Sequence, residues 1–227
     1  MKLIDMSGPI YTGMWTYGPP FPEYKLVDIK EPDWVESFSP KSQAFEGFYM
    51  LTGSYIDGPS HAFGMEKEKP MHEIPLEKIF GVDAYVYKFP LDELPKEGKR
   101  PYITMDHVRE AEKEPVPDGA PIILATGWGS HWDKEDYLPN AWFLRKEVAE
   151  YFAAKKPIIL GGDTPYSDNL ENEQGNWLIL YGAGINLLGP LINTELLTKF
   201  KVKLYVAPLN IVNTTGLPVR IIVVEED

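Results

Sequence analysis

An acidic and a basic side chain lie four residues apart in one short segment, where Asp57 is followed by His61. Histidine exchanges a proton near neutral pH, and a carboxylate that contacts the ring can orient it as a general base. Tyr55 adds a hydroxyl that can donate a hydrogen bond to a carbonyl oxygen. These residue types can perform acid–base chemistry on a carbonyl compound. Each also has a purely structural interpretation: Asp57 can hold the turn before Pro59 through backbone amides, His61 can be hydrogen-bonded in a loop, and Tyr55 can pack.

The segment around these residues reads Leu51-Thr-Gly-Ser-Tyr-Ile-Asp57-Gly-Pro59-Ser-His61. It resembles the metal-site signature H-x-G-T-H-x-D-x-P-x-H of the cyclase family, which includes bacterial kynurenine formamidase. The positions that match are Gly53, Asp57, Pro59 and His61, and Ser54 replaces the threonine. Leu51 and Tyr55 stand where the family has its first two histidines.

Five more segments resemble the family, in the family's order. They are Leu3-Ile-Asp5-Met-Ser-Gly-Pro9-Ile with Gly13-Met, Met71-His-Glu-Ile-Pro75 to Gly81, Leu124-Ala-Thr126-Gly127-Trp128, Gly161-Gly-Asp163-Thr-Pro165-Tyr-Ser-Asp168, and Ala207-Pro208-Leu with Gly216-Leu-Pro218-Val-Arg220. The resemblance covers nearly the whole chain. It implies an α/β fold in which a mixed β-sheet curls towards a barrel and helices flank it.

The resemblance also implies a metal site, which this chain does not retain. Family members bind two divalent metals, zinc or manganese, whose bound water attacks an amide or lactone carbonyl. Alignment of Gly184-Ile-Asn-Leu-Leu-Gly189 with the distal ligand pattern puts Gly189 at a glutamate position and Trp177 at a histidine position. Only Asp57 and His61 then keep a ligand side chain. We therefore expect no metal cofactor, or at most one weakly bound zinc or manganese ion, and no kynurenine formamidase activity.

A single rebuilt metal site would have to draw on other carboxylates. The candidates beside Asp57 and His61 are Asp163, Asp168 and Glu173. Asp163 and Asp168 align with family aspartates that look structural and are not metal ligands.

The resemblance assigns functional residues to one pocket. Catalysis is expected from Asp57, His61 and Tyr55, and substrate binding from Trp15, Ser54, Trp128, His131 and Trp177. Packing or a surface position remains the alternative for the tryptophans and for His131. Asp57 paired with His61 would raise the pKa of the imidazole by charge attraction.

Composition limits the class of protein. A chain of 227 residues with 44% hydrophobic residues can form one domain, 1–227, with a sizeable core. The net charge of −12 argues against a nucleic-acid partner, which would need a basic surface. No apolar run reaches the roughly 18 residues of a membrane span, no signal peptide is apparent, and there is no cysteine. We expect a cytoplasmic protein with a small-molecule substrate. From the family, we expect a homodimer or homotetramer.

The elements that must position these residues follow from the apolar pattern. Short apolar runs predict buried strands at 84–87, 121–125, 157–160, 203–207 and 219–224. Leu144, Val148, Tyr151 and Phe152 recur at helical spacing. A second helix is predicted after Thr104, a suitable N-cap, with Val108 and Ala111 inward. The strand–helix–strand run from Pro121 to Leu160 predicts a parallel crossover unit. Residues 18–32 are too rich in proline for a helix and predict an extended arm, and residues 112–121 predict a surface loop.

Three functions remain open from the sequence. The chain can be an enzyme that uses acid–base chemistry in place of the two-metal water. It can be an amidase or lactonase with a rebuilt site for one metal. It can also be a non-catalytic relative that binds a small molecule or acts as a structural partner. Metal content separates the second from the others, and turnover separates the first from the third.

Overall fold

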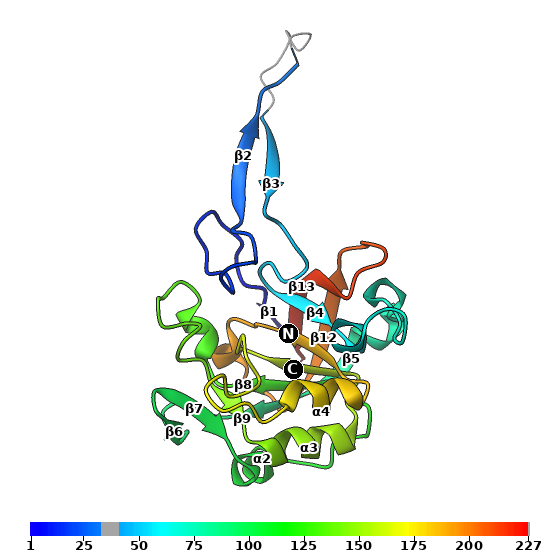
Figure 1. Cartoon of the computed structure of the whole chain (residues 1–227). Helices are drawn as coiled ribbons and strands as arrows, with labels where there is room; N and C mark the ends of the chain where they lie inside the picture. Colours follow the sequence, from blue (N-terminus) through cyan, green and yellow to red (C-terminus); the bar gives the residue numbers. More distant parts are fainter. Residues whose placement is uncertain (33–40, 227) are drawn as a thin grey trace.

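The structure is a computed structural model that describes residues 1–32 and 41–226. Within these residues, eight strands form the largest sheet: β1 (Lys2–Asp5), β4 (Tyr55–Asp57), β5 (Phe80–Lys88), β8 (Ile122–Ala125), β10 (Ile159–Gly162), β11 (Asn186–Gly189), β12 (Lys201–Pro208) and β13 (Gly216–Glu225). Their order in the sheet is β1-β13-β12-β5-β8-β10-β11-β4. Both ends of the described chain therefore contribute to the same sheet (Figure 1).

The sheet closes because β4 pairs on both of its sides. Asp57 lies opposite Leu187 of β11 and also opposite Gly216 of β13. Seven of the described strands thus form a barrel-like ring, and β1 pairs with β13 beside it. β5, β8, β10 and β11 run parallel, whereas β12, β13 and β4 pair antiparallel. The mixed sheet curled towards a barrel is confirmed.

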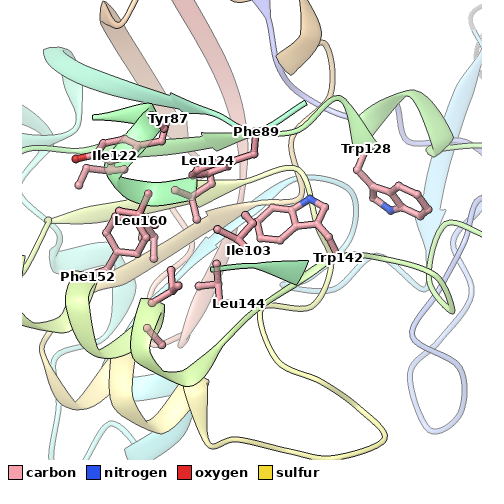
Figure 2. Packing of buried hydrophobic residues seen from close by; sticks show 14 of the residues in the cluster. Tyr87, Phe89, Ile103, Ile122, Leu124, Trp128, Trp142, Leu144, Phe152 and Leu160 are labelled. Atoms are coloured by element: carbon pink, nitrogen blue, oxygen red, sulfur yellow. The ribbon is translucent and has the colours of Figure 1, made fainter. Parts of the chain in front are cut away.

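Helices cover one side of this ring (Figure 1). They are α2 (Met105–Ala111), α3 (Lys146–Lys155) and α4 (Asn176–Gly182). Phe152 of α3 packs with Leu124 and Leu160 of the sheet in one buried cluster (Figure 2). A second buried cluster, which includes Ile56 and Val223, fills the inside of the ring. The sheet therefore has one apolar layer within the ring and one beneath the helices.

The predicted strands and helices are found with shifted ends. Each of the five predicted runs overlaps β5, β8, β10, β12 or β13. The parallel unit β8–α3–β10 is present, and α2 begins after Thr104, whose backbone N–H donates to His107 Nδ1 at 3.0 Å. Leu144 is not helical. It pairs with Ile103 as part of a short strand, so the helix begins two residues later.

The predicted arm forms one strand of a hairpin. β2 (Lys25–Ile29) pairs antiparallel with β3 (Ser42–Glu46), and the hairpin projects from the body of the protein (Figure 1). Every β2 residue is exposed. Strand β3 was not predicted from the sequence.

The remaining elements are short. They are α1 (Pro59–Phe63), β6 (Lys96–Glu97), β7 (Arg100–Ile103), β9 (Phe143–Leu144) and the 3-10 turns Met71–Glu73, Leu76–Lys78, Trp128–His131 and Thr194–Leu196. Among the described residues, no helix is both long and apolar enough for a transmembrane span.

Candidate active site

A cavity of about 470 Å³ lies between the sheet and α4. Its walls come from β4, α1, β10, α4 and β11, together with Tyr17 and Phe21 that precede the hairpin. This volume is in the range of small-molecule sites. The predicted residues Tyr55, Asp57, His61 and Trp177 all line it, although more than a hundred residues separate Trp177 from the others.

Strand alternation explains how β4 presents two functional side chains together. Successive side chains of a strand point to opposite faces, so Tyr55 and Asp57 share one face. Both line the cavity, whereas Ile56 between them is fully buried inside the ring. His61 follows on α1, which starts at Pro59.

Asp57 is the ionisable group most strongly affected by this environment. Its side chain is 4% exposed, and Tyr181 donates a hydrogen bond to Oδ1 at 3.0 Å. Burial raises the pKa of Asp57 from 3.8 to about 7, because the charged carboxylate loses water, and the Tyr181 bond only partly opposes this rise. Asp57 can therefore exchange a proton at neutral pH.

Two phenols stand beside this carboxyl. The hydroxyl oxygens of Tyr17 and Tyr55 lie 2.7 Å apart in a hydrogen bond. Burial raises the pKa of both phenols well above the ordinary value, and nearby groups, including Asp57, raise them further. Both hydroxyls stay protonated at neutral pH and can donate hydrogen bonds.

His61 lies at the exposed edge of the cavity. Its Nδ1 is 3.4 Å from Thr215 Oγ1, and its ring centroid is 6.3 Å from that of Tyr181. Partial burial lowers the pKa of His61. The expected rise through pairing with Asp57 is therefore wrong: the imidazole loses water, while the carboxylate is bonded to Tyr181 instead.

The positions of the missing metal ligands also line the cavity. Leu51, Trp177 and Gly189 offer no donor atom to a cation, and a Cβ at position 189 would lie 2.5 Å from the Gly162 carbonyl oxygen. The Tyr55 hydroxyl is bonded to Tyr17. Within residues 1–32 and 41–226, no group of three or more His, Asp or Glu side chains is arranged to hold a metal ion. The residues present do not fit a dinuclear metal centre.

The two aspartates considered for a rebuilt site have structural partners. Asp163 accepts from the backbone of residues 126–128, from the Trp142 indole at 2.7 Å and from the hydroxyls of Thr126 and Thr194. Asp168 accepts from the backbone amides of residues 169, 174 and 176. Both side chains hold loops together.

Four of the expected binding residues lie outside the lining of this cavity. Ser54 Oγ donates to the Pro190 carbonyl at 2.6 Å and accepts from the Gly8 amide. Trp128 stacks on His131, whose Nδ1 bonds Asp136 Oδ1 at 2.9 Å. Trp15 packs edge-on against Trp132. The side chains of Trp15, Ser54, Trp128 and His131 thus contact other protein groups, and their roles in substrate binding stay predictions.

Three tyrosines that line the cavity were not predicted from the sequence: Tyr17, Tyr166 and Tyr181. Tyr181 follows Trp177 by four residues on α4, so helical spacing puts it on the same face. That spacing could have indicated Tyr181. Tyr17 precedes a proline-rich run with no periodic pattern, and only the fold shows its position.

Comparison with known structures defines the class of fold. Isatin hydrolase A from Labrenzia aggregata, bound to benzyl benzoate, superposes with a TM-score of 0.80 at 20% identity, and the superposition covers 98% of this chain and 93% of that chain. An isatin hydrolase bound to the product analogue thioisatinate superposes with a TM-score of 0.80 at 18% identity, and the superposition covers 100% of this chain and 93% of that chain. A predicted metal-dependent hydrolase from Bacillus stearothermophilus superposes with a TM-score of 0.75 at 21% identity, and the superposition covers 98% of this chain and 97% of that chain. The fold is that of these hydrolases.

The family follows from the sequence itself. Residues 4–169 match the Cyclase family model, and the chain belongs to this family. The resemblance drawn from the motifs is therefore confirmed. Comparison with curated proteins finds no match.

Proposed function

We propose that this protein is an enzyme that acts on a small carbonyl compound, such as an amide, a lactone or a cyclisable metabolite, by acid–base chemistry without a dinuclear metal centre. The observation that carries the proposal is the buried carboxyl of Asp57, which lines the same cavity as the Tyr17–Tyr55 hydroxyl pair. A perturbed carboxyl in a cavity is a typical sign of a functional site.

Each side chain has a role that its environment supports. Asp57, with a pKa of about 7, takes up and returns a proton during the reaction. Tyr181 holds the ionised carboxylate through its hydrogen bond to Oδ1. Tyr55 donates to the carbonyl oxygen of the substrate. His61, neutral at pH 7 because its pKa is lowered, exchanges protons between the cavity edge and water.

The test is turnover by wild type and by Asp57→Asn with a panel of small amides, lactones and ketones. Loss of a general base typically costs about 100- to 10,000-fold in rate. Asp118→Asn, which changes an exposed carboxyl in a loop, is the matched control and should retain full activity. The wild type should keep its activity after treatment with a chelator.

Three results would overturn the proposal. Full activity in Asp57→Asn would exclude this carboxyl as the acid or base. Activity that disappears with the chelator and returns with zinc or manganese would instead support a site for one metal. No turnover with any compound, together with specific binding, would support a non-catalytic relative.

We also propose that the chain forms a homodimer or homotetramer in the cytoplasm. The β2–β3 hairpin exposes Val27, Ile29 and Phe45, and an isolated two-stranded hairpin is only marginally stable in water. Contact with another copy would stabilise it. Light scattering on the purified protein tests this, and a monomer at micromolar concentration would contradict it.

A further inference from the structure

We propose that Tyr17 and Tyr55 together bind one carbonyl oxygen, and that the substrate is an uncharged ring ketone or lactone which loses a proton from the carbon next to that carbonyl. The inference rests on the proposed function of Asp57 as a base. It adds Tyr17 as a residue that contacts the substrate, and it selects enolisation as the reaction.

The hydroxyl pair has a proton to offer. Two hydroxyls carry two protons, and one of them makes the mutual bond of 2.7 Å. The other contact of the Tyr17 hydroxyl is the Pro165 carbonyl at 3.4 Å, which is long for an O–H···O bond. A ligand oxygen beside Tyr17 and Tyr55 would therefore accept a hydrogen bond from the second hydroxyl, which has only a long contact within the protein.

Aromatic neighbours fix the position of this pair. The Tyr17 ring meets Trp15, Phe21 and Tyr166 edge-on, with centroid distances of 5.3, 6.1 and 5.5 Å. Tyr55 is held by strand pairing on both sides of β4. Donors that are fixed before the reaction stabilise a developing oxyanion without reorganisation, and they act strongly where water is excluded.

The base lies at a suitable separation from the donors. Tyr55 and Asp57 are two residues apart on β4, so their Cα atoms are separated by roughly 6.6 Å along the strand. A ketone that bonds Tyr55 through its oxygen can thus present a neighbouring C–H bond to Asp57. Tyr181 occupies Oδ1 of that carboxylate, which leaves Oδ2 for the proton.

The step needs no co-reactant. The Asp57 carboxylate takes a proton from carbon, and the electrons of the broken C–H bond form a C=C bond. The π electrons of the carbonyl move to its oxygen, which accepts a hydrogen bond from the phenol pair. The proton on the Asp57 carboxylic acid exchanges with water. Asp57 then returns a proton to the carbon, which gives the original compound with a solvent hydrogen, or to the oxygen, which gives the enol isomer.

The cavity selects an uncharged ring. No Lys or Arg is among the described residues that line it, so a carboxylate on the substrate would meet the buried Asp57 without a counter-charge. The walls include Phe21, Trp142, Tyr166 and Trp177, which suit contact with a flat ring.

Binding of 2-naphthol, a ring-bearing mimic of an enol, tests the phenol pair by fluorescence titration. Tyr17→Phe and Tyr55→Phe should each weaken binding by about tenfold or more. Tyr11→Phe, which alters an exposed tyrosine, should leave it unchanged. The charged analogue 6-hydroxy-2-naphthoate should bind at least about tenfold more weakly than 2-naphthol. Circular dichroism checks that each variant is folded.

Deuterium exchange of 2-tetralone in D2O, followed by NMR, tests the proton step separately. We expect wild type to exchange the hydrogens next to the carbonyl faster than buffer does, and Asp57→Asn to fall to the buffer rate. Normal naphthol binding in folded Tyr17→Phe would overturn the role of the phenol pair, even if exchange persists. Intact binding without exchange would overturn enolisation, while Asp57-dependent turnover of another carbonyl compound would leave the broader proposed function standing.

Discussion

Replacement of Asp57 by asparagine should stabilise the folded protein at alkaline pH. The carboxyl has its ordinary pKa of 3.8 in the unfolded chain and a pKa of about 7 when buried in the native state. The folded state therefore binds more protons than the unfolded state between these values. Stability contributed by the protonated acid is present below pH 3.8 and is lost progressively as pH rises to about 7.

The magnitude follows from the same two values. The difference between 3.8 and about 7 corresponds to about 4 kcal/mol of unfolding free energy, because each unit corresponds to about 1.4 kcal/mol. Asparagine avoids this cost and keeps an oxygen that can accept from Tyr181. For a chain of this size, 4 kcal/mol corresponds to a rise on the order of 10 °C in melting temperature.

The assay is urea unfolding of wild type and Asp57→Asn from pH 4 to pH 9. Other groups titrate in both proteins, so the informative quantity is the difference in unfolding free energy between the variant and wild type. The unfolding free energy of the variant should increasingly exceed that of wild type as pH rises to 7, and the difference should then stay constant. Asp118→Asn should show no such trend. If the variant is less stable than wild type at pH 8, burial of the Asp57 carboxylate is not destabilising, and Asp57 instead holds the turn at Pro59.

Three further predictions concern the same site and its support. Tyr181→Phe removes the hydrogen bond that lowers the pKa of Asp57, so the pH below which activity falls should rise by about one pH unit. An unchanged pH profile of activity would count against this contact. Purified protein should hold well under one equivalent of zinc or manganese per chain by elemental analysis, because Leu51, Trp177 and Gly189 supply no ligand; two equivalents that survive dialysis against a chelator would contradict this. Asp163→Ala should destabilise the fold by at least about 3 kcal/mol in urea, because it leaves the Trp142 indole and several buried donors without an acceptor; a loss below 1 kcal/mol would disprove its structural role.

The sequence predicted the framework of the fold better than its closure. The run 121–125 is recognisable because a strand buried on both faces of a sheet is continuously apolar. The run 219–224 is recognisable by its β-branched residues, although burial alternates along β13. β4 has only three residues, too few to show a period, yet its pairing with β11 and β13 closes the ring. Such pairing depends on contacts between distant parts of the chain, which local patterns do not show.

The resemblance to the family grouped Asp57, His61 and Trp177, and these side chains line one cavity. The expected bond between Asp57 and His61 was wrong, because the partner of the carboxylate is Tyr181, which comes from α4. Hydrogen-bond partners across such distances depend on how a helix is rotated against the sheet, and a motif gives no information about that rotation.

Titration of the Asp57 carboxyl carbon by 13C NMR, assigned by comparison with Asp57→Asn, measures directly whether this side chain exchanges a proton at neutral pH inside the cavity. We expect a midpoint near pH 7. A midpoint near the ordinary value of 3.8 would contradict this expectation, since a carboxylate that is already ionised far below neutrality would not serve as the proposed acid and base.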